Sequence, residues 1–139
     1  MSRYARGQLH RALDAVIDIS AARGRHKRAL EEAIAHIKAQ YPKYVDLVDK
    51  IMYKPRVWSQ GNRGLYYAPP YNKIELYPQN MQNLTAAYVE TLRHELEHAM
   101  QHIVAKLETK DWPIAKREVE AHRAASRAHS RFLYGKELP

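Results

Sequence analysis

The feature that most constrains this chain is an amphipathic segment between about residues 84 and 108. Its apolar side chains recur at three- and four-residue intervals, the period of an α-helix with one buried face. These side chains are Leu84, Tyr88, Leu92, Leu96, Ala99, Ile103 and Leu107. We therefore expect one long, half-buried helix in this part of the chain.

A metal-binding pattern lies within that helix, in the run His94-Glu95-Leu96-Glu97-His98. Residues four apart on a helix share a face at about 5–6 Å, so both imidazoles can reach one ion. Glu95 lies close enough to take a proton from a metal-bound water without being a ligand itself. The chain has no cysteine, so a transition-metal site must be built from His, Asp and Glu. The pattern predicts one bound zinc ion per chain.

A zinc site of this kind needs a third protein ligand, and the next predicted helix, from about 112 to 133, offers two carboxylates. Glu118 and Glu120 lie two residues apart and point about 200° away from each other, so only one of them can face the metal. Helix geometry alone leaves this choice open.

HExxH followed by a downstream helix with ExxA resembles the gluzincin metallopeptidases, and Glu118 to Ala121 matches ExxA, with nineteen residues between His98 and Glu118. The small ImmA/IrrE-type proteases are the nearest relatives that we can name, and the resemblance covers about residues 72–125. It implies a zincin-like fold, with His94, His98 and Glu118 as zinc ligands and Glu95 as general base. The implied activity is zinc-dependent hydrolysis of peptide bonds, most simply by an endopeptidase.

The segment from residue 73 to residue 77 alternates in polarity, as a strand with one wet face does. We interpret it as an edge strand. By the resemblance, it corresponds to the strand along which gluzincins bind an extended substrate. Its residues are Lys73, Ile74, Glu75, Leu76 and Tyr77.

Peptide hydrolysis also needs a hydrogen-bond donor for the oxyanion that forms on the carbonyl. The sequence offers several donors and does not choose among them: Tyr66, Tyr67, Tyr71, His122 and His129. His122 lies one turn beyond Glu118, where it could orient a ligand, donate to the transition state or simply pack as a polar residue.

The remaining segments predict a single α+β domain over residues 1–139. Residues 1–55 are expected to be helical and residues 56–78 to form a small antiparallel or mixed sheet. The helices are expected at about 8–22, 26–40 and 44–52, and the three strands at 56–59, 65–68 and 73–77. Residues 84–133 then hold the active-site and glutamate helices.

The charge of the chain suggests a second class of function. Lys and Arg number 23 against 15 Asp and Glu, and twelve of these basic residues lie within the first 60 positions. Such an excess can bind nucleic acid, so the alternatives are a nucleic-acid-binding protein with a structural metal or none, and a DNA-associated SprT-like protease. An inactive scaffold of the same fold is a further alternative. No apolar run is long enough for a membrane span, and no secretory signal is seen, so we expect a cytoplasmic protein without a membrane partner.

Overall fold

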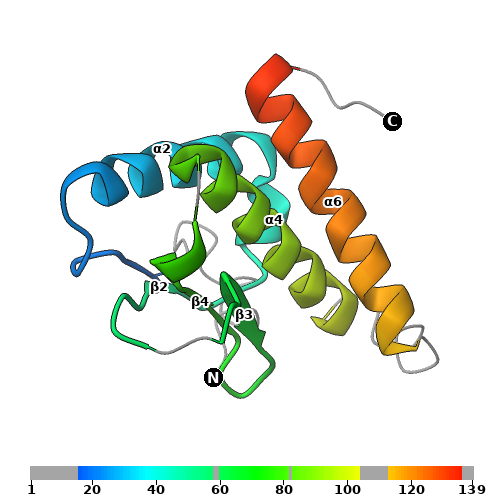
Figure 1. The fold of residues 1–139 in the computed structure, drawn as a ribbon. Helices are drawn as coiled ribbons and strands as arrows, with labels where there is room; N and C mark the ends of the chain where they lie inside the picture. The colour runs from blue at the N-terminus through cyan, green and yellow to red at the C-terminus, as the bar shows by residue number, and fades with distance from the viewer. Residues whose placement is uncertain (1–15, 58–59, 82, 104–112, 136–139) are drawn as a thin grey trace.

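A four-stranded mixed sheet and four helices form the part of the chain that the computed structural model describes, which is residues 16–57, 60–81, 83–103 and 113–135 (Figure 1). The strands are β1 (Val16–Asp18), β2 (Lys50–Tyr53), β3 (Gly64–Tyr67) and β4 (Lys73–Leu76). The helices are α2 (Gly24–Gln40), α3 (Pro42–Val45), α4 (Leu84–Ile103) and α6 (Ile114–Tyr134), with a 3₁₀ turn, η1, at Pro78–Asn80. The predicted α+β class is confirmed.

The sheet has the strand order β1-β2-β4-β3. β1, β2 and β4 run parallel, and β3 returns antiparallel to β4 along one edge. Ile17, Ile51 and Ile74 stand side by side in this register, on the face that turns toward the core. The sheet therefore offers one apolar face to the helices, as a two-layer fold requires.

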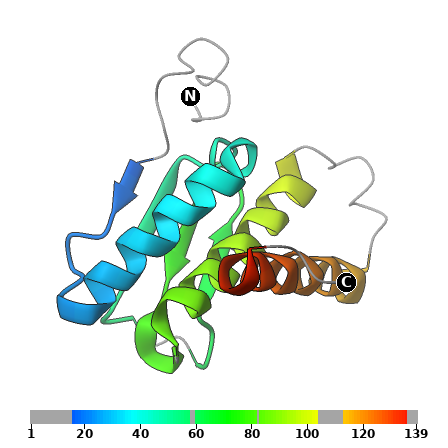
Figure 2. The same ribbon diagram turned by 90° about the horizontal axis from the view of Figure 1, so that it is seen from above.

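Helices α2 and α4 cover that face, and the view from above shows α2 lying along the sheet beside α4 (Figure 2). Leu30 and Ile37 of α2 and Leu92 and Leu96 of α4 are fully buried in the same core. Their spacing of three, four or seven residues keeps each set on one helical face, which explains why these segments are helical.

Helix α6 packs along α4 (Figure 1). Its buried residues are all alanines, namely Ala121, Ala124, Ala125 and Ala128. Small side chains at an interface let two helix axes approach closely, so side chains from both helices can reach a common point. The helix ends at Gly135, whose φ of 76° closes it in the left-handed conformation.

The predicted helices of the site are confirmed within the described residues. α4 fills 84–103 of the expected 84–108, with 104–108 outside the described residues, and α6 occupies 114–134 where 112–133 was expected. The strand expected at 65–68 is found at 64–67, and the helix expected at 26–40 is found at 24–40.

The N-terminal prediction was wrong in part. The helix expected over 8–22 is contradicted at 16–18, which form β1, while residues 8–15 lie outside the described residues. The helix expected over 44–52 is reduced to α3, and its second half is β2. Parallel pairing of β2 with both β1 and β4 decides this outcome, because such long-range contacts override local propensity. The sheet therefore has four strands instead of three.

The strand expected at 56–59 is not formed at residues 56 and 57, and 58–59 lie outside the described residues. Among the helices within the described ranges, none is both long and apolar enough to cross a bilayer.

Candidate metal centre

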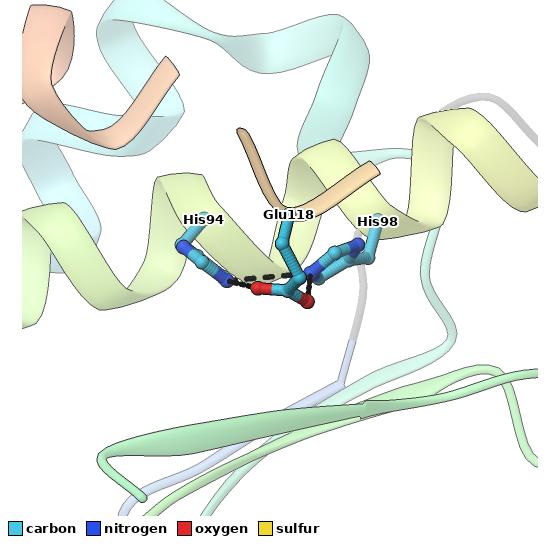
Figure 3. A group of neighbouring side chains, drawn as sticks. All are labelled: His94, His98 and Glu118. Carbon is cyan, nitrogen blue, oxygen red and sulfur yellow. Dashed lines mark hydrogen bonds and ion pairs between the residues drawn. The ribbon is translucent and has the colours of Figure 1, made fainter. Parts of the chain in front are cut away.

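Three predicted ligands, two from α4 and one from α6, meet at one point between the helices (Figure 3). The Nε2 atoms of His94 and His98 lie 3.3 Å apart. The Glu118 carboxylate lies against both, with Oε2 3.3 Å from His94 Nε2 and Oε1 2.8 Å from His98 Nε2. One potential ligand atom from each residue lies within 4.8 Å of the other two. Two imidazoles and a carboxylate are a donor set that suits zinc.

Glu118 and not Glu120 faces the two histidines. The Glu120 carboxylate instead accepts a hydrogen bond from Nη1 of Arg123 at 3.1 Å, on an exposed part of α6. The alternative that the sequence left open is therefore decided by which side of α6 packs against α4.

Gln101 fixes the orientation of His98, and the sequence analysis did not identify it as a site residue. Its Nε2 donates to the backbone carbonyl of Arg117 at 3.1 Å, which turns its Oε1 toward His98 Nδ1, also at 3.1 Å. Since Oε1 can only accept, Nδ1 of His98 has to carry a proton. In the sequence, Gln101 was visible only as a polar residue three positions after His98. The structure shows that it is buried, with 2% of its surface exposed.

The hydrogen bonds around His98 leave room for a proton or a metal ion between this residue and Glu118. With its proton on Nδ1, a neutral His98 presents a lone pair at Nε2. That lone pair faces a Glu118 oxygen at only 2.8 Å. Two acceptors at this distance repel each other unless a proton or a metal ion lies between them. The residues present therefore fit a bound metal ion.

The electrostatic environment keeps His94 in the form that binds metals. Burial, and after it the charge of His98, lowers the pKa of His94 to about 4; Glu118 opposes this shift and His122 adds to it. A pKa this low leaves the imidazole neutral near pH 7, which is the state required of a ligand.

Glu95 lies beside the three ligands on the side of the sheet edge. Its Oε2 is 3.9 Å from His94 Nε2, and its carboxylate accepts a hydrogen bond from the backbone N–H of Tyr66 in β3. Burial, and after it the charge of Glu118, raises the pKa of Glu95 to about 8. A cation held by the three ligands would favour the charged carboxylate and so oppose this rise.

Gly64 lets β3 approach α4 closely enough to form this contact. A Cβ at Gly64 would lie 2.7 Å from Cγ2 of Thr91 and 3.4 Å from Cγ of Glu95. A side chain there would collide with the helix that carries the site.

A cleft runs past the three ligands on both sides. One half holds about 400 Å³ and reaches toward Gln101, and we call it the Gln101 half. The other holds about 520 Å³, reaches toward Glu90 and is called the Glu90 half. Both halves are bordered by Gly64, Glu95 and Glu118. The candidate metal centre therefore lies where the two halves of the cleft adjoin.

The prediction that residues 73–77 form the edge strand was wrong. Lys73–Leu76 is β4, which pairs with β2 on one side and β3 on the other, and Tyr77 follows it. Ile74, Glu75, Leu76 and Tyr77 are all buried. The expected wet face is missing because Tyr77 Oη donates to Glu75 at 2.8 Å and Lys73 Nζ pairs with Glu75 at 3.1 Å. β3 is the edge strand that borders the cleft.

Of the five candidate oxyanion donors, the structure brings His122 to the three ligands. The His122 ring centroid is 4.6 Å from that of His94, and its Nε2 is 3.8 Å from Glu118 Oε2. Its side chain is 73% exposed and so has room to meet a bound molecule.

The other four candidates have different partners. Tyr66 donates to Asn72 at 2.9 Å, and Tyr67 shares a hydrogen bond with Tyr77. His129 pairs with Glu90 at 3.4 Å, at the far end of the cleft. Tyr71 is largely exposed and lies near the Lys73 ammonium group.

No protein-family model, curated protein or solved structure matches this chain. A function for it has to be inferred from its own residues.

Proposed function

We propose that this protein is a zinc-dependent metallopeptidase with a zincin-like fold that cleaves peptide bonds within extended chains. The observation that supports this most directly is the convergence of His94, His98 and Glu118 beside the buried Glu95, in the middle of an open cleft. A structural zinc site is usually closed by four protein ligands, whereas a hydrolytic site keeps a position for water. Here three ligands converge at the floor of a cleft.

The role that we propose for each residue follows from the position of its side chain. His94, His98 and Glu118 would hold the ion, and Gln101 keeps the Nε2 lone pair of His98 aimed at it. A bound zinc ion supplies a water molecule of lowered pKa and polarises the scissile carbonyl. Glu95 would accept the proton of that water on its carboxylate and pass it to the leaving amine.

The substrate would lie along β3, because this strand forms the edge that faces the cleft. An extended peptide can add to such an edge through main-chain hydrogen bonds. The cleft continues on both sides of the three ligands, so chain can extend in both directions from the bond that is cut. This openness favours an endopeptidase.

His122 is the donor that we propose for the oxyanion. It extends over the same cleft half as Glu90 and is exposed, while its ring lies against His94. Donors that meet developing charge in this way lower the barrier of acyl-transfer reactions.

Metal analysis of the purified protein tests the zinc site first. We expect about one zinc per chain, lost in a His94→Ala/His98→Ala double variant. Glu118→Gln should weaken binding, whereas Glu120→Gln should leave it unchanged, since Glu120 faces away from the site. A protein that takes up no zinc on titration, or a Glu120 variant that loses it, would contradict the ligand assignment.

Hydrolysis is tested on a fluorogenic peptide library with the zinc-loaded protein. Glu95→Gln should keep zinc and fold but reduce cleavage by at least about 10²-fold, the scale of general-base catalysis. Cleavage at the wild-type rate in this variant would refute the mechanism.

Nucleic-acid binding is a second proposal, and it is supported by a basic cluster at the start of α2. Arg23, Arg25, Lys27 and Arg28 are all exposed, and none of them is among the residues that border the cleft. Binding to DNA or RNA that weakens steeply with salt would support a docking role for this cluster. No detectable binding at low salt would exclude it.

A further inference from the structure

The two halves of the cleft differ in how their positive charge is balanced. In the Glu90 half, the guanidinium of Arg63 lies 3.6 Å from a Glu90 carboxylate oxygen, and His129 lies 3.4 Å from the other oxygen. The cation of this half therefore already has an anionic partner in the protein.

The Gln101 half has a guanidinium without such a partner. Arg117 borders this half next to Glu118, and its Nε is buried without a hydrogen-bond partner. Among the described residues, no carboxylate forms an ion pair with Arg117. The acidic residues that border this half are Glu95 and Glu118, and both face the metal site.

The backbone and the side chain of Arg117 have separate roles. Its carbonyl accepts the hydrogen bond from Gln101 that helps to hold His98, so the position of the residue is fixed to the metal site. Its side chain starts about 100° around the helix from that of Glu118, because consecutive helical residues are separated by that angle. Arg117 borders the Gln101 half together with Glu118, so a ligand that contacts the metal site and continues into this half passes beside Arg117.

A guanidinium carries five N–H donors in a planar fork, so its Nη groups can bind a carboxylate with two parallel hydrogen bonds while Nε stays buried. We propose that Arg117 is a specificity residue that binds a carboxylate of the peptide substrate on the Gln101 side of the scissile bond. This inference rests on the proposed function for the identity of the ligand as a peptide. The carboxylate is that of an Asp or Glu side chain or the C-terminal carboxylate of the peptide.

The test measures binding separately from cleavage. Zinc-loaded Glu95→Gln protein is titrated with short fluorescent peptides, acetylated and amidated at their ends, in which a single Glu is moved along a neutral sequence. Each peptide is matched by versions with Gln and with Lys at the same place. At one position we expect the Glu peptide to bind about tenfold more tightly than the Gln peptide, as a charge-assisted hydrogen bond would provide. The Lys peptide should bind most weakly.

Two variants then test whether Arg117 causes the preference for Glu. Arg117→Gln, made in the Glu95→Gln background, keeps the backbone carbonyl and should abolish the preference for Glu. Arg117→Glu should reverse it in favour of Lys. Lys116→Gln is the matched control, since it removes the same charge from the neighbouring exposed position, and it should leave the preference intact.

A final peptide pair distinguishes the two sources of the carboxylate. A peptide that ends at the preferred position with a free C-terminus is compared with its amide. Tighter binding of the free acid, lost in Arg117→Gln, would show that a chain end is recognised; a preference confined to internal Glu would show that a side chain is.

Equal binding of the Glu and Lys peptides at every position, a preference that survives Arg117→Gln, or no binding by any peptide would overturn the inference. Failure of the proposed function gives a different result, because the same titration can be run on the metal-free protein: a protein that cleaves nothing and holds no zinc can still be scored there for the Arg117-dependent preference.

Discussion

Gln101→Met gives the sharpest test of how the metal site is held together. Methionine has nearly the length of glutamine and suits a buried position, but it cannot replace the two amide hydrogen bonds. These join Gln101 to His98 and to the Arg117 carbonyl at 3.1 Å each. The substitution therefore removes the support of one ligand while leaving all three ligands in the chain.

The expected magnitude follows from these two bonds. Each neutral hydrogen bond contributes about 1 kcal/mol, so the metal-free protein should lose about 2 kcal/mol of unfolding free energy. Zinc affinity should fall about 10- to 100-fold, because His98 can then turn or place its proton on Nε2. Urea unfolding in the presence of a chelator measures the first effect. Competition with a chelating dye measures the second.

Thr91→Val is the control for Gln101→Met. Thr91 is also buried in α4, and its hydroxyl donates to the Ala87 carbonyl at 2.8 Å without contacting a ligand. It should lower stability without weakening zinc binding. If Gln101→Met bound zinc as tightly as the wild type, the proposed role of Gln101 in fixing His98 would be refuted.

Two further predictions concern the fold around the site. Gly64→Ala should cost about 1–3 kcal/mol of unfolding free energy and reduce activity, because its Cβ would lie 2.7 Å from a Thr91 methyl group and 3.2 Å from the Glu75 carbonyl; an unchanged urea midpoint would contradict this close packing. Burial, and after it the charge of Arg131, lowers the pKa of His36 from 6.5, so its contribution to stability is complete above pH 6.5 and is lost as the pH falls toward the lowered value. His36→Gln should therefore reduce the fall in metal-free stability between pH 7.5 and pH 5.5, and an identical pH dependence in both proteins would count against it.

The sequence was sufficient to predict helix α4 because a single helical period of apolar residues runs through it. Leu92, Leu96 and Ala99 define a buried face, and His94 and His98 follow the same helical period on the nearly opposite side of the helix. These relations are local, so they do not depend on how distant segments pack.

The choice between Glu118 and Glu120 as the third ligand could not be made from the sequence of their own helix. The sequence showed that Glu118 and Glu120 could not both face the metal, and the resemblance to gluzincins favoured Glu118. In the structure Glu118 is the glutamate that lies beside His98, because the buried alanines of α6 set the rotation of this helix against α4.

The N-terminal strands were missed for the opposite reason. Short apolar runs such as Val16-Ile17 and Ile51-Met52 are compatible with either a helix or a strand. Their strand pairing is settled by partners more than 20 residues away in the chain, and no local pattern records such partners.

The error at β4 has a related cause. Alternating polarity indicates which side of a strand is polar, but it does not tell whether that side meets water. Glu75 is buried because Lys73 and Tyr77 on the same side cover and bind it.

The division of the ligands between two helices has a mechanical consequence. His94 and His98 belong to α4, and Glu118 belongs to α6, so an ion bound to all three would act as a cross-link between the two helices. The buried side chains of α6 are all alanines, and a few polar pairs such as Gln101 with Arg117 and His129 with Glu90 add to the contact. Small apolar contacts bury little area and hold helices together weakly. Because an ion that binds only the docked arrangement stabilises it in proportion to the logarithm of its concentration, zinc supply would set how firmly α6 is fastened. Coordination of zinc by Glu118 would thus both complete the metal site and hold α6 against the rest of the protein.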